Sequence, residues 1–161
     1  MGKYWLFKSE PDVFSFADLA ASPGKTAPWD GVRNFQARNF LRDEVKPGDQ
    51  VLFYHSRIQP PCIVGIAEVV REAYPDPTAW DPTSPYSDSR STPEKPLWYA
   101  VDVRWTREFA SPVTLPMLKS DPALEELLVI RKGMRLSIQP VSEQHFQRIM
   151  EINSFILLLS V

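Results

Sequence analysis

Segments with the character of β-strands are grouped along this chain instead of alternating regularly with helices. Aromatic and apolar residues predict strands over four segments: 3–8, 50–55, 62–73 and 97–109. Two short helices are expected between the first strand and the second, over 15–20 and 33–42. This grouping favours an α+β fold, with a curved mixed sheet or small barrel flanked by helices.

The last third of the chain predicts short helical pieces over 114–128, a strand over 134–141 and a final helix capped by Ser142. The apolar run within the tail at 154–161 is far too short to span a bilayer, so we expect no membrane association. We expect the tail to be a buried terminal strand or the end of the last helix, or else a non-native extension. It suggests no function.

A chain of 161 residues fits one domain, 1–161, with room for a hydrophobic core. Its formal net charge of −2 argues against a protein that binds nucleic acid mainly by neutralising phosphates, but it is compatible with a pocket for a single base. One cysteine, Cys62, excludes an internal disulfide, and with only two histidines it argues against a zinc site. We therefore expect a reducing compartment and no metal. We also expect no signal peptide, because the N-terminus runs directly into the aromatic and apolar segment 4–7, which is followed by Lys8 and Glu10.

The segment from Trp29 to Asn34 brings together tryptophan, aspartate, glycine, arginine and asparagine. Asp30-Gly31 is disfavoured both inside a helix and in a central strand, so we expect a loop. Loops held by a rigid scaffold often carry binding residues, and an exposed tryptophan beside planar hydrogen-bonding groups suits a nucleobase. The alternative is a buried Trp29 that anchors the loop, with Arg33 as a solvated charge at a helix start.

Polar groups also gather where predicted strands end. Residues 8–10 close the first strand with a lysine, a serine and a glutamate, and residues 53–56 close the second with aromatic, imidazole and hydroxyl groups. Because side chains alternate along a strand, Arg135, Ser137 and Gln139 share one face. Strand ends of this kind can line one mouth of a barrel. The alternative for each group is a solvated or purely structural role.

Signatures of catalysis are weak. The six glycines form no phosphate-binding loop, and Cys62 opens an apolar strand, which favours a core position over a nucleophile. One alternative is an enzyme that acts on a nucleotide or modified base, with His55 and Glu10 as acid and base; Glu10 could pair with Asp30 only through the tertiary fold. Another is a module in which the long polar loop at 75–96 docks a protein or small molecule.

Five segments in order resemble the EVE domain. Each segment closely matches the family's sequence over several consecutive residues. The five segments lie at 3–11, 28–39, 51–56, 65–76 and 135–141. The resemblance extends from about residue 3 to residue 152, and the length is similar to that of compact bacterial members. The apolar tail departs from the usual ending of the family, which puts in doubt only the C-terminal boundary.

The resemblance implies a PUA-like fold, which is a small, open, mixed β-barrel flanked by short helices. It also implies a non-catalytic reader, without a cofactor, that binds a modified nucleobase in an aromatic pocket. The base would be a cytosine derivative in DNA, with modified RNA as the alternative. EVE domains often accompany nucleases or other defence enzymes, which would then be partners. Localisation would be cytoplasmic, or nuclear in a eukaryote, and the oligomeric state stays open.

The resemblance and the strand-end groups together give a set of candidate residues. We expect the base to be bound by Trp29 as a stacking platform, Tyr54 as a second wall, and the polar groups of Asn34, Ser9, His55 and Ser137. We expect phosphates and the rim of the pocket to be contacted by Lys8, Arg33, Arg38, Arg135 and Gln139. Because these phosphate contacts are few, binding should depend only weakly on salt.

Overall fold

A computed structural model describes residues 2–159, without the side chain of residue 157. The strands in this part of the chain are β1 (Tyr4–Ser9), β2 (Thr26–Trp29), β3 (Gln50–His55), β4 (Cys62–Pro75), β5 (Tyr99–Thr114) and β6 (Ile138–Val141). The α-helices are α1 (Phe16–Ala21), α2 (Phe35–Asp43), α3 (Leu115–Ser120) and α4 (Glu143–Leu159). Short 3₁₀ turns lie at Pro23–Lys25, Pro77–Trp80, Pro122–Leu124 and Leu128–Ile130.

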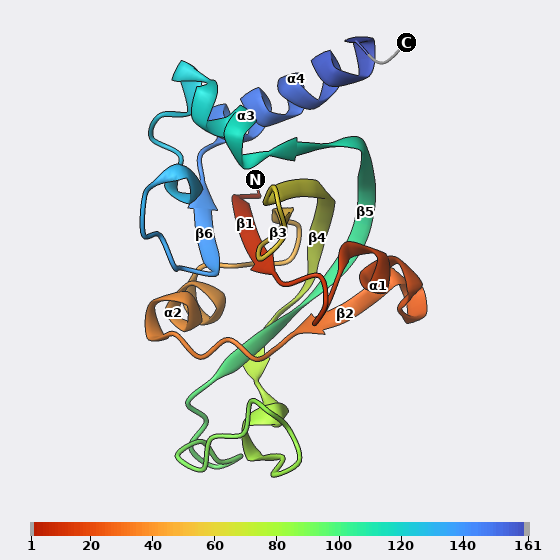
Figure 1. Ribbon diagram of the computed structural model, residues 1–161. Coiled ribbons are helices and arrows are strands. Elements are labelled where there is room, and N and C mark those ends of the chain that lie inside the picture. Colours follow the sequence, from red (N-terminus) through yellow and green to blue (C-terminus); the bar gives the residue numbers. More distant parts are fainter. Residues whose placement is uncertain (1, 160–161) are drawn as a thin grey trace.

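All six of these strands belong to one mixed sheet, in the order β2-β5-β4-β3-β1-β6. The β1–β3 pair is parallel and the other pairs are antiparallel. The sheet curls strongly, but β2 and β6 stand at its two ends and do not pair with each other (Figure 1). The expected α+β class is therefore confirmed, whereas the expected small open barrel is not confirmed, because the sheet does not close.

Two hydrophobic clusters lie on opposite faces of the sheet. Alternation along β1 sends Trp5 and Phe7 into the first cluster and Leu6 into the second. The first cluster also takes in residues of α1 and α2, and the second takes in residues of α3 and α4. Figure 1 shows α2 below the curled strands and α3 and α4 above them. The two faces therefore give neighbouring strand residues quite different surroundings.

Side-chain caps fix where the first two helices begin. The Ser15 hydroxyl accepts the Asp18 N–H while the Asp18 carboxylate accepts the Ser15 N–H, so a capping box opens α1. The Asn34 side-chain oxygen accepts the Ala37 N–H at 2.9 Å and caps α2. Asn34 is thus held at the junction between the loop after β2 and the start of α2.

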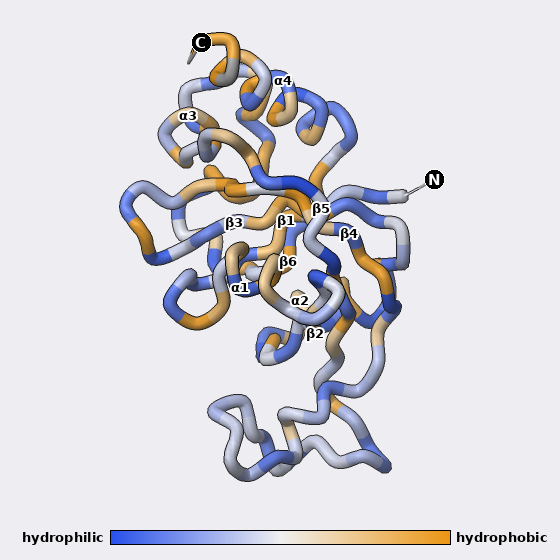
Figure 2. The backbone as a smooth tube through the Cα atoms, turned by 90° about the vertical axis from the view of Figure 1, so that its right-hand side faces the viewer, coloured by the Kyte–Doolittle hydropathy of each residue, from blue (hydrophilic) through white to orange (hydrophobic). Residues whose placement is uncertain are grey.

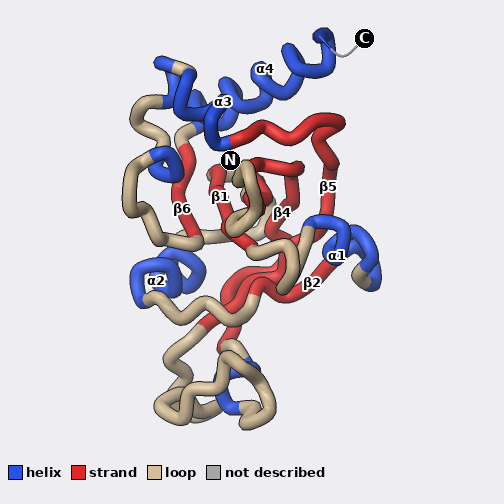
Figure 3. Tube along the Cα trace, in the orientation of Figure 1, coloured by secondary structure: helices blue, strands red, loops and turns tan. Residues whose placement is uncertain are grey.

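The long segment between β4 and β5 forms a separate lobe, defined here as residues 76–98. β4 and β5 run without a break from the curled sheet toward it (Figure 3). The coil of the lobe is mostly hydrophilic or neutral along its length (Figure 2). It is nevertheless pinned, because Trp98 is buried and its indole N–H donates to the Asp88 carboxylate at 2.8 Å. The expected long polar loop is present, and it is folded back on itself.

Three expectations about elements differ from the structure. Trp29 ends strand β2 and is not a loop residue. The strand β2 has only four residues, one of which is Pro28, so the sequence gives no clear strand pattern there. Proline is tolerated in β2 because it is an edge strand. The predicted strand at 134–141 is shortened to Ile138–Val141.

The apolar tail continues helix α4 as far as Leu159, and the last turns of this helix are hydrophobic (Figure 2). The last two positions of the tail, 160–161, lie outside the described residues. The expectation of a helix end is confirmed, but burial is wrong for three of its side chains, since Phe155, Leu158 and Leu159 are exposed. Within residues 2–159, no helix has both the length and the apolar character needed to cross a membrane.

Candidate functional site

A cavity of about 600 Å³ opens between the end of β1, the loop after β2 and the lobe. Its walls come from segments that are far apart in the sequence: Lys8, Ser9, Glu10, Val13, Phe14, Ala27, Pro28, Trp29, Asp30, Gly31, Val32, Arg33, Asn34, Tyr86 and Ser137. Several of the residues that were expected to bind a base therefore do share one cavity, and the lobe contributes Tyr86 to it.

Trp29 is a wall of this cavity and also a part of the core. Its side chain is only 7% exposed, and its ring centre lies 5.1 Å from that of Phe7 and 5.3 Å from that of Phe53. The expectation of an exposed tryptophan is wrong, and the alternative of a buried anchor is correct. Because the remaining surface of Trp29 faces the cavity, the indole can still contact a ligand there.

The loop after β2 follows a path that only glycine allows at position 31. Gly31 has a φ of 77°, and a Cβ there would lie 2.8 Å from the Tyr86 ring. Its N–H donates to the Asp76 carboxylate at 2.9 Å. The loop and the lobe are therefore in direct contact at the edge of the cavity.

Arg33 clamps the same loop to the lobe. The guanidinium donates to the Asp76 carboxylate at 2.9 Å, to the Tyr86 carbonyl at 2.7 and 3.0 Å, and to the Thr78 hydroxyl at 3.1 Å. A further bond reaches the Val32 carbonyl, so all five N–H donors of the side chain are engaged. The expectation that Arg33 contacts phosphate is therefore wrong, as is the alternative of a solvated charge.

Asp76 is completely buried beneath this clamp. Burial by itself opposes ionisation, but hydrogen bonds from Thr78, from the Gly31 N–H and from Arg33 outweigh it and hold the pKa of Asp76 below its ordinary value. The carboxylate is thus ionised at neutral pH, and it organises the loop and the lobe around one negative charge.

Asp30 places a second carboxyl group in the cavity wall itself. Its pKa is raised, first by burial and then by the nearby charge of Asp76, while its own backbone hydrogen bond and Arg33 oppose the rise. A partly desolvated carboxylate of this kind gains from a hydrogen-bond donor. Glu10 lines the same cavity, but its carboxylate pairs with Arg57 at 2.7 Å.

Three expected polar residues line the cavity with part of their hydrogen-bonding capacity in use. The Lys8 ammonium donates to the Met134 carbonyl at 2.9 Å, and burial lowers its pKa. The Ser9 hydroxyl donates to the Phe14 carbonyl at 2.5 Å. Asn34 uses its side-chain oxygen to cap α2, which leaves its NH₂ group as a donor. Ser137, which directly precedes β6, also lines the cavity.

Three other expected residues do not reach the cavity. Tyr54 lies in the second hydrophobic cluster, so it is not a second wall; burial and the nearby Cys62 raise its pKa to about 12. The Nε2 atom of His55 accepts the Phe16 N–H at 3.1 Å, and burial lowers the pKa of this imidazole. Gln139 is buried, with its amide bonded to the Leu136 carbonyl at 2.8 Å, so it is not a rim contact.

The last two expected cations stand outside the cavity walls. Arg38 donates to the Leu97 carbonyl at 2.7 Å and lies 5.0 Å from the centre of the Phe35 ring. Arg135 is exposed. Both belong to segments that border the cavity, because Arg38 is on α2 after Asn34 and Arg135 precedes Ser137. Phosphate contacts by these two residues stay predictions.

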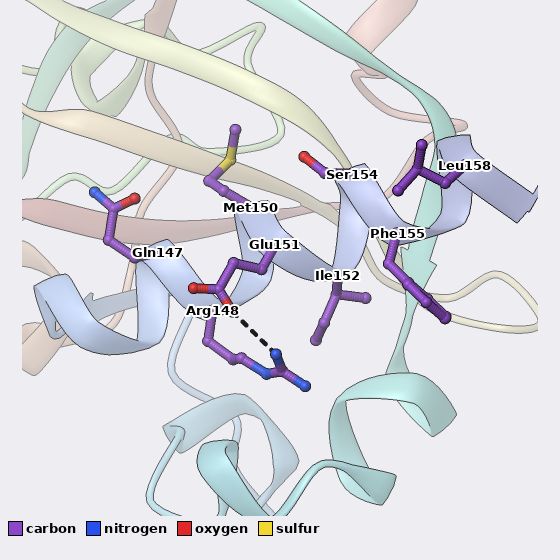
Figure 4. A pocket seen from close by; sticks show the side chains of 8 residues that line it. All are labelled: Gln147, Arg148, Met150, Glu151, Ile152, Ser154, Phe155 and Leu158. Carbon is purple, nitrogen blue, oxygen red and sulfur yellow. Dashed lines mark hydrogen bonds and ion pairs between the residues drawn. The ribbon is translucent and has the colours of Figure 1, made fainter.

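A second hollow lies elsewhere, along helix α4 (Figure 4). Its volume is about 680 Å³, and all of its lining side chains belong to α4, among them Met150, Phe155 and Leu158. The close-up shows the ion pair between Arg148 and Glu151, at 3.0 Å, along one side. It is a surface groove on a single helix, and none of the expected site residues lies in it.

Comparison with known proteins shows the family to which the chain belongs. A family model described as EVE domain matches residues 3–152. Thymocyte nuclear protein 1 from Gallus gallus is 40% identical over an alignment of 165 positions, which covers 92% of this chain and 68% of that protein. The match to the family model includes every segment that lines the cavity and ends before the apolar tail.

Solved structures are similar over nearly the full length. A hypothetical protein from Leishmania major has a TM-score of 0.91 and 46% identity, with 98% of each chain covered. A crystal structure of the human THYN1 protein in complex with 5-methylcytosine-containing DNA has a TM-score of 0.88 and 38% identity. The match to it covers 94% of this chain and 98% of that one.

Proposed function

The chain belongs to the EVE domain family, and from this premise we propose that it is a non-catalytic reader that binds DNA through a modified cytosine held in the cavity. The complex of human THYN1 with 5-methylcytosine-containing DNA supports the proposal, because that protein shares this fold over 94% of this chain. The cavity adds a second line of support, since it has room for one planar base and combines apolar with hydrogen-bonding walls.

The single observation that carries the proposal is the meeting of Trp29, Asp30 and Asn34 at one cavity. The Asp30 carboxylate accepts a hydrogen bond from the exocyclic amine of cytosine, which is the pairing that carboxylates make with this base. The Asn34 NH₂ group donates to a ring nitrogen or carbonyl oxygen of the base. Trp29 and Phe14 supply apolar surface for the ring and its methyl group.

Binding in this mode requires the base to leave its stack. Extrusion from a duplex costs a few kcal/mol, and contact with an aromatic surface returns about 1–3 kcal/mol. The net charge of −2 leaves little non-specific attraction to phosphates to make up a deficit. The pocket contacts therefore have to provide most of the affinity, which makes the base modification decisive.

The test is a binding panel of short oligonucleotides that differ only at one cytosine: unmodified, 5-methyl or 5-hydroxymethyl. Each is measured as single strand and duplex, and in DNA and RNA form, against the native chain and the Asp30→Asn variant. We expect tighter binding of a modified DNA, and a loss of at least about fivefold in Asp30→Asn, because one good base contact contributes about 1–3 kcal/mol.

Asp43→Asn is the matched control, because Asp43 is an exposed carboxylate at the end of α2. It removes the same charge as Asp30→Asn, which by itself would strengthen binding to a polyanion. A weaker complex for Asp30→Asn beside an equal or stronger one for Asp43→Asn therefore identifies a specific contact. Equal affinity of the native chain for modified and unmodified strands in every form would refute the reader function.

A further inference from the structure

Phe35 is a large aromatic side chain that remains 47% exposed at the border of the cavity. It is the first residue of α2 and directly follows Arg33 and Asn34, which both line the cavity. Its Cα atom is therefore about 3.8 Å from that of Asn34, which lines the cavity, so the backbone of Phe35 borders the cavity wall. This exposed aromatic surface is therefore available to a ligand bound at the cavity.

The Phe35 ring is held in position from behind. It stacks on Trp98, with ring centres 4.8 Å apart and an angle of 26° between the planes. Trp98 is buried and is itself fixed by its hydrogen bond to Asp88. Because one face of Phe35 covers Trp98, its exposed surface is the opposite face and the ring edge.

Cationic groups surround this stack. The Arg38 guanidinium lies 5.0 Å from the Phe35 ring centre and 5.9 Å from that of Trp98. The Arg33 guanidinium lies 5.4 Å from the Trp98 ring centre, but its charge is already paired with that of Asp76. Arg38 is tethered through its bond to the Leu97 carbonyl, at 2.7 Å. A rigid aromatic face beside a fixed positive charge matches the two parts of a nucleotide, a flat base and a phosphate.

We propose that Phe35 is a stacking platform for the base next to the modified cytosine on the same strand. The proposal rests on the proposed function and adds a second site to it. Stacking on an aromatic ring accepts any base, so the platform adds affinity without reading sequence. It also holds the strand in a splayed form in which the modified base points into the cavity while its neighbour stays outside on α2.

A double-mutant cycle tests the platform. Single-stranded oligonucleotides with one 5-methylcytosine carry either normal bases or an abasic residue at the 5′ or the 3′ neighbour. Phe35→Ala should weaken binding of the intact strand about fivefold to a hundredfold, as expected for the loss of one base–aromatic stack. With the abasic residue on the platform side, the native chain should bind weakly and Phe35→Ala should add no further loss.

Two variants serve as controls. Phe35→Trp keeps an aromatic face and should retain the affinity of the native chain. Phe155→Ala removes another exposed aromatic ring, on α4 and outside the residues that line the cavity, and should change nothing. Circular dichroism and urea unfolding of Phe35→Ala confirm that the variant is folded.

The outcomes separate the two proposals. If the native chain prefers the methylated strand but Phe35→Ala binds it equally well, the platform is wrong and the reader function stands. If the effects of Phe35→Ala and the abasic residue multiply, the two do not share a contact and the platform is likewise wrong. If the native chain shows no preference for a modified strand, the reader function is wrong, and the platform proposal, which rests on it, is wrong as well.

Discussion

Arg33 and Asp76 form an ion pair at 2.9 Å that joins the loop after β2 to the lobe. Asp76 is fully buried, and the Arg33 side chain is 22% exposed. The pair is satisfied by further hydrogen bonds on both sides, which is the condition under which buried charges are stable in a protein. The wall of the cavity thus depends on two residues that are far apart in the sequence.

Replacing Asp76 by asparagine should destabilise the protein by about 3 kcal/mol, because it leaves the Arg33 guanidinium without its counter-charge. Urea unfolding at neutral pH measures this change. Glu94→Gln is the matched control, since Glu94 is an exposed carboxylate of the same lobe, and it should stay within about 0.5 kcal/mol of the native chain. Equal stability of the two variants would show that the ion pair does not hold the lobe.

The contact between Gly31 and Tyr86 leads to a second prediction. Gly31→Ala should lose about 1–2 kcal/mol for its positive φ, and more because the new methyl group would meet the Tyr86 ring. Adding Tyr86→Ala should remove the steric part, so that the double variant is more stable than the sum of the single effects predicts. Strictly additive effects in urea unfolding would contradict a direct contact.

His55 makes stability depend on pH. Burial holds its pKa below the ordinary value of 6.5, so the unfolded chain binds a proton at a higher pH than the folded chain does. The stabilisation is complete above about pH 6.5 and is lost as the pH falls toward the lower folded pKa. The slope from this one group is at most about 1.4 kcal/mol per pH unit.

His55→Gln isolates this effect, because an amide oxygen can replace Nε2 as acceptor for the Phe16 N–H without titrating. The measurement is the urea midpoint of both proteins between pH 7.5 and 5. We expect the native chain to lose more stability than the variant over this range. Parallel curves would mean that the imidazole keeps its ordinary pKa in the folded chain.

Much of the fold was predictable from local patterns. Alternation and apolar content correctly located β1, β3, β4 and β5, and the Ser15 cap correctly placed the start of α1. β2 was missed because its four residues include Pro28, and its pairing with β5 is decided by the tertiary fold. The class was therefore readable from the sequence, but the edge strand that carries Trp29 was not.

The site was less predictable, for two physical reasons. The role of Arg33 depends on Asp76, which lies 43 residues away and carries no local signal of burial. Alternation places Tyr54 and Phe53 on opposite faces of β3, but only the folded chain shows that the face of Phe53 is the one that carries Trp29. Asp30 was considered only as a possible partner of Glu10 and not as a base-binding residue, since its desolvation is visible only in the folded chain.

Asn153 carries the last prediction, which concerns the part of α4 beyond the family match. Its side chain is fully buried, and neither its oxygen nor its nitrogen has a hydrogen-bond partner among the described residues. Leaving such an amide unsatisfied costs about 1–3 kcal/mol, so Asn153→Leu, with a side chain of similar size, should raise the free energy of unfolding by about that amount. Ser154→Leu, at the exposed neighbouring position, is the control and should have little effect on urea unfolding. If Asn153→Leu is instead less stable than the native chain, the Asn153 amide makes a hydrogen bond in solution, and the prediction is wrong.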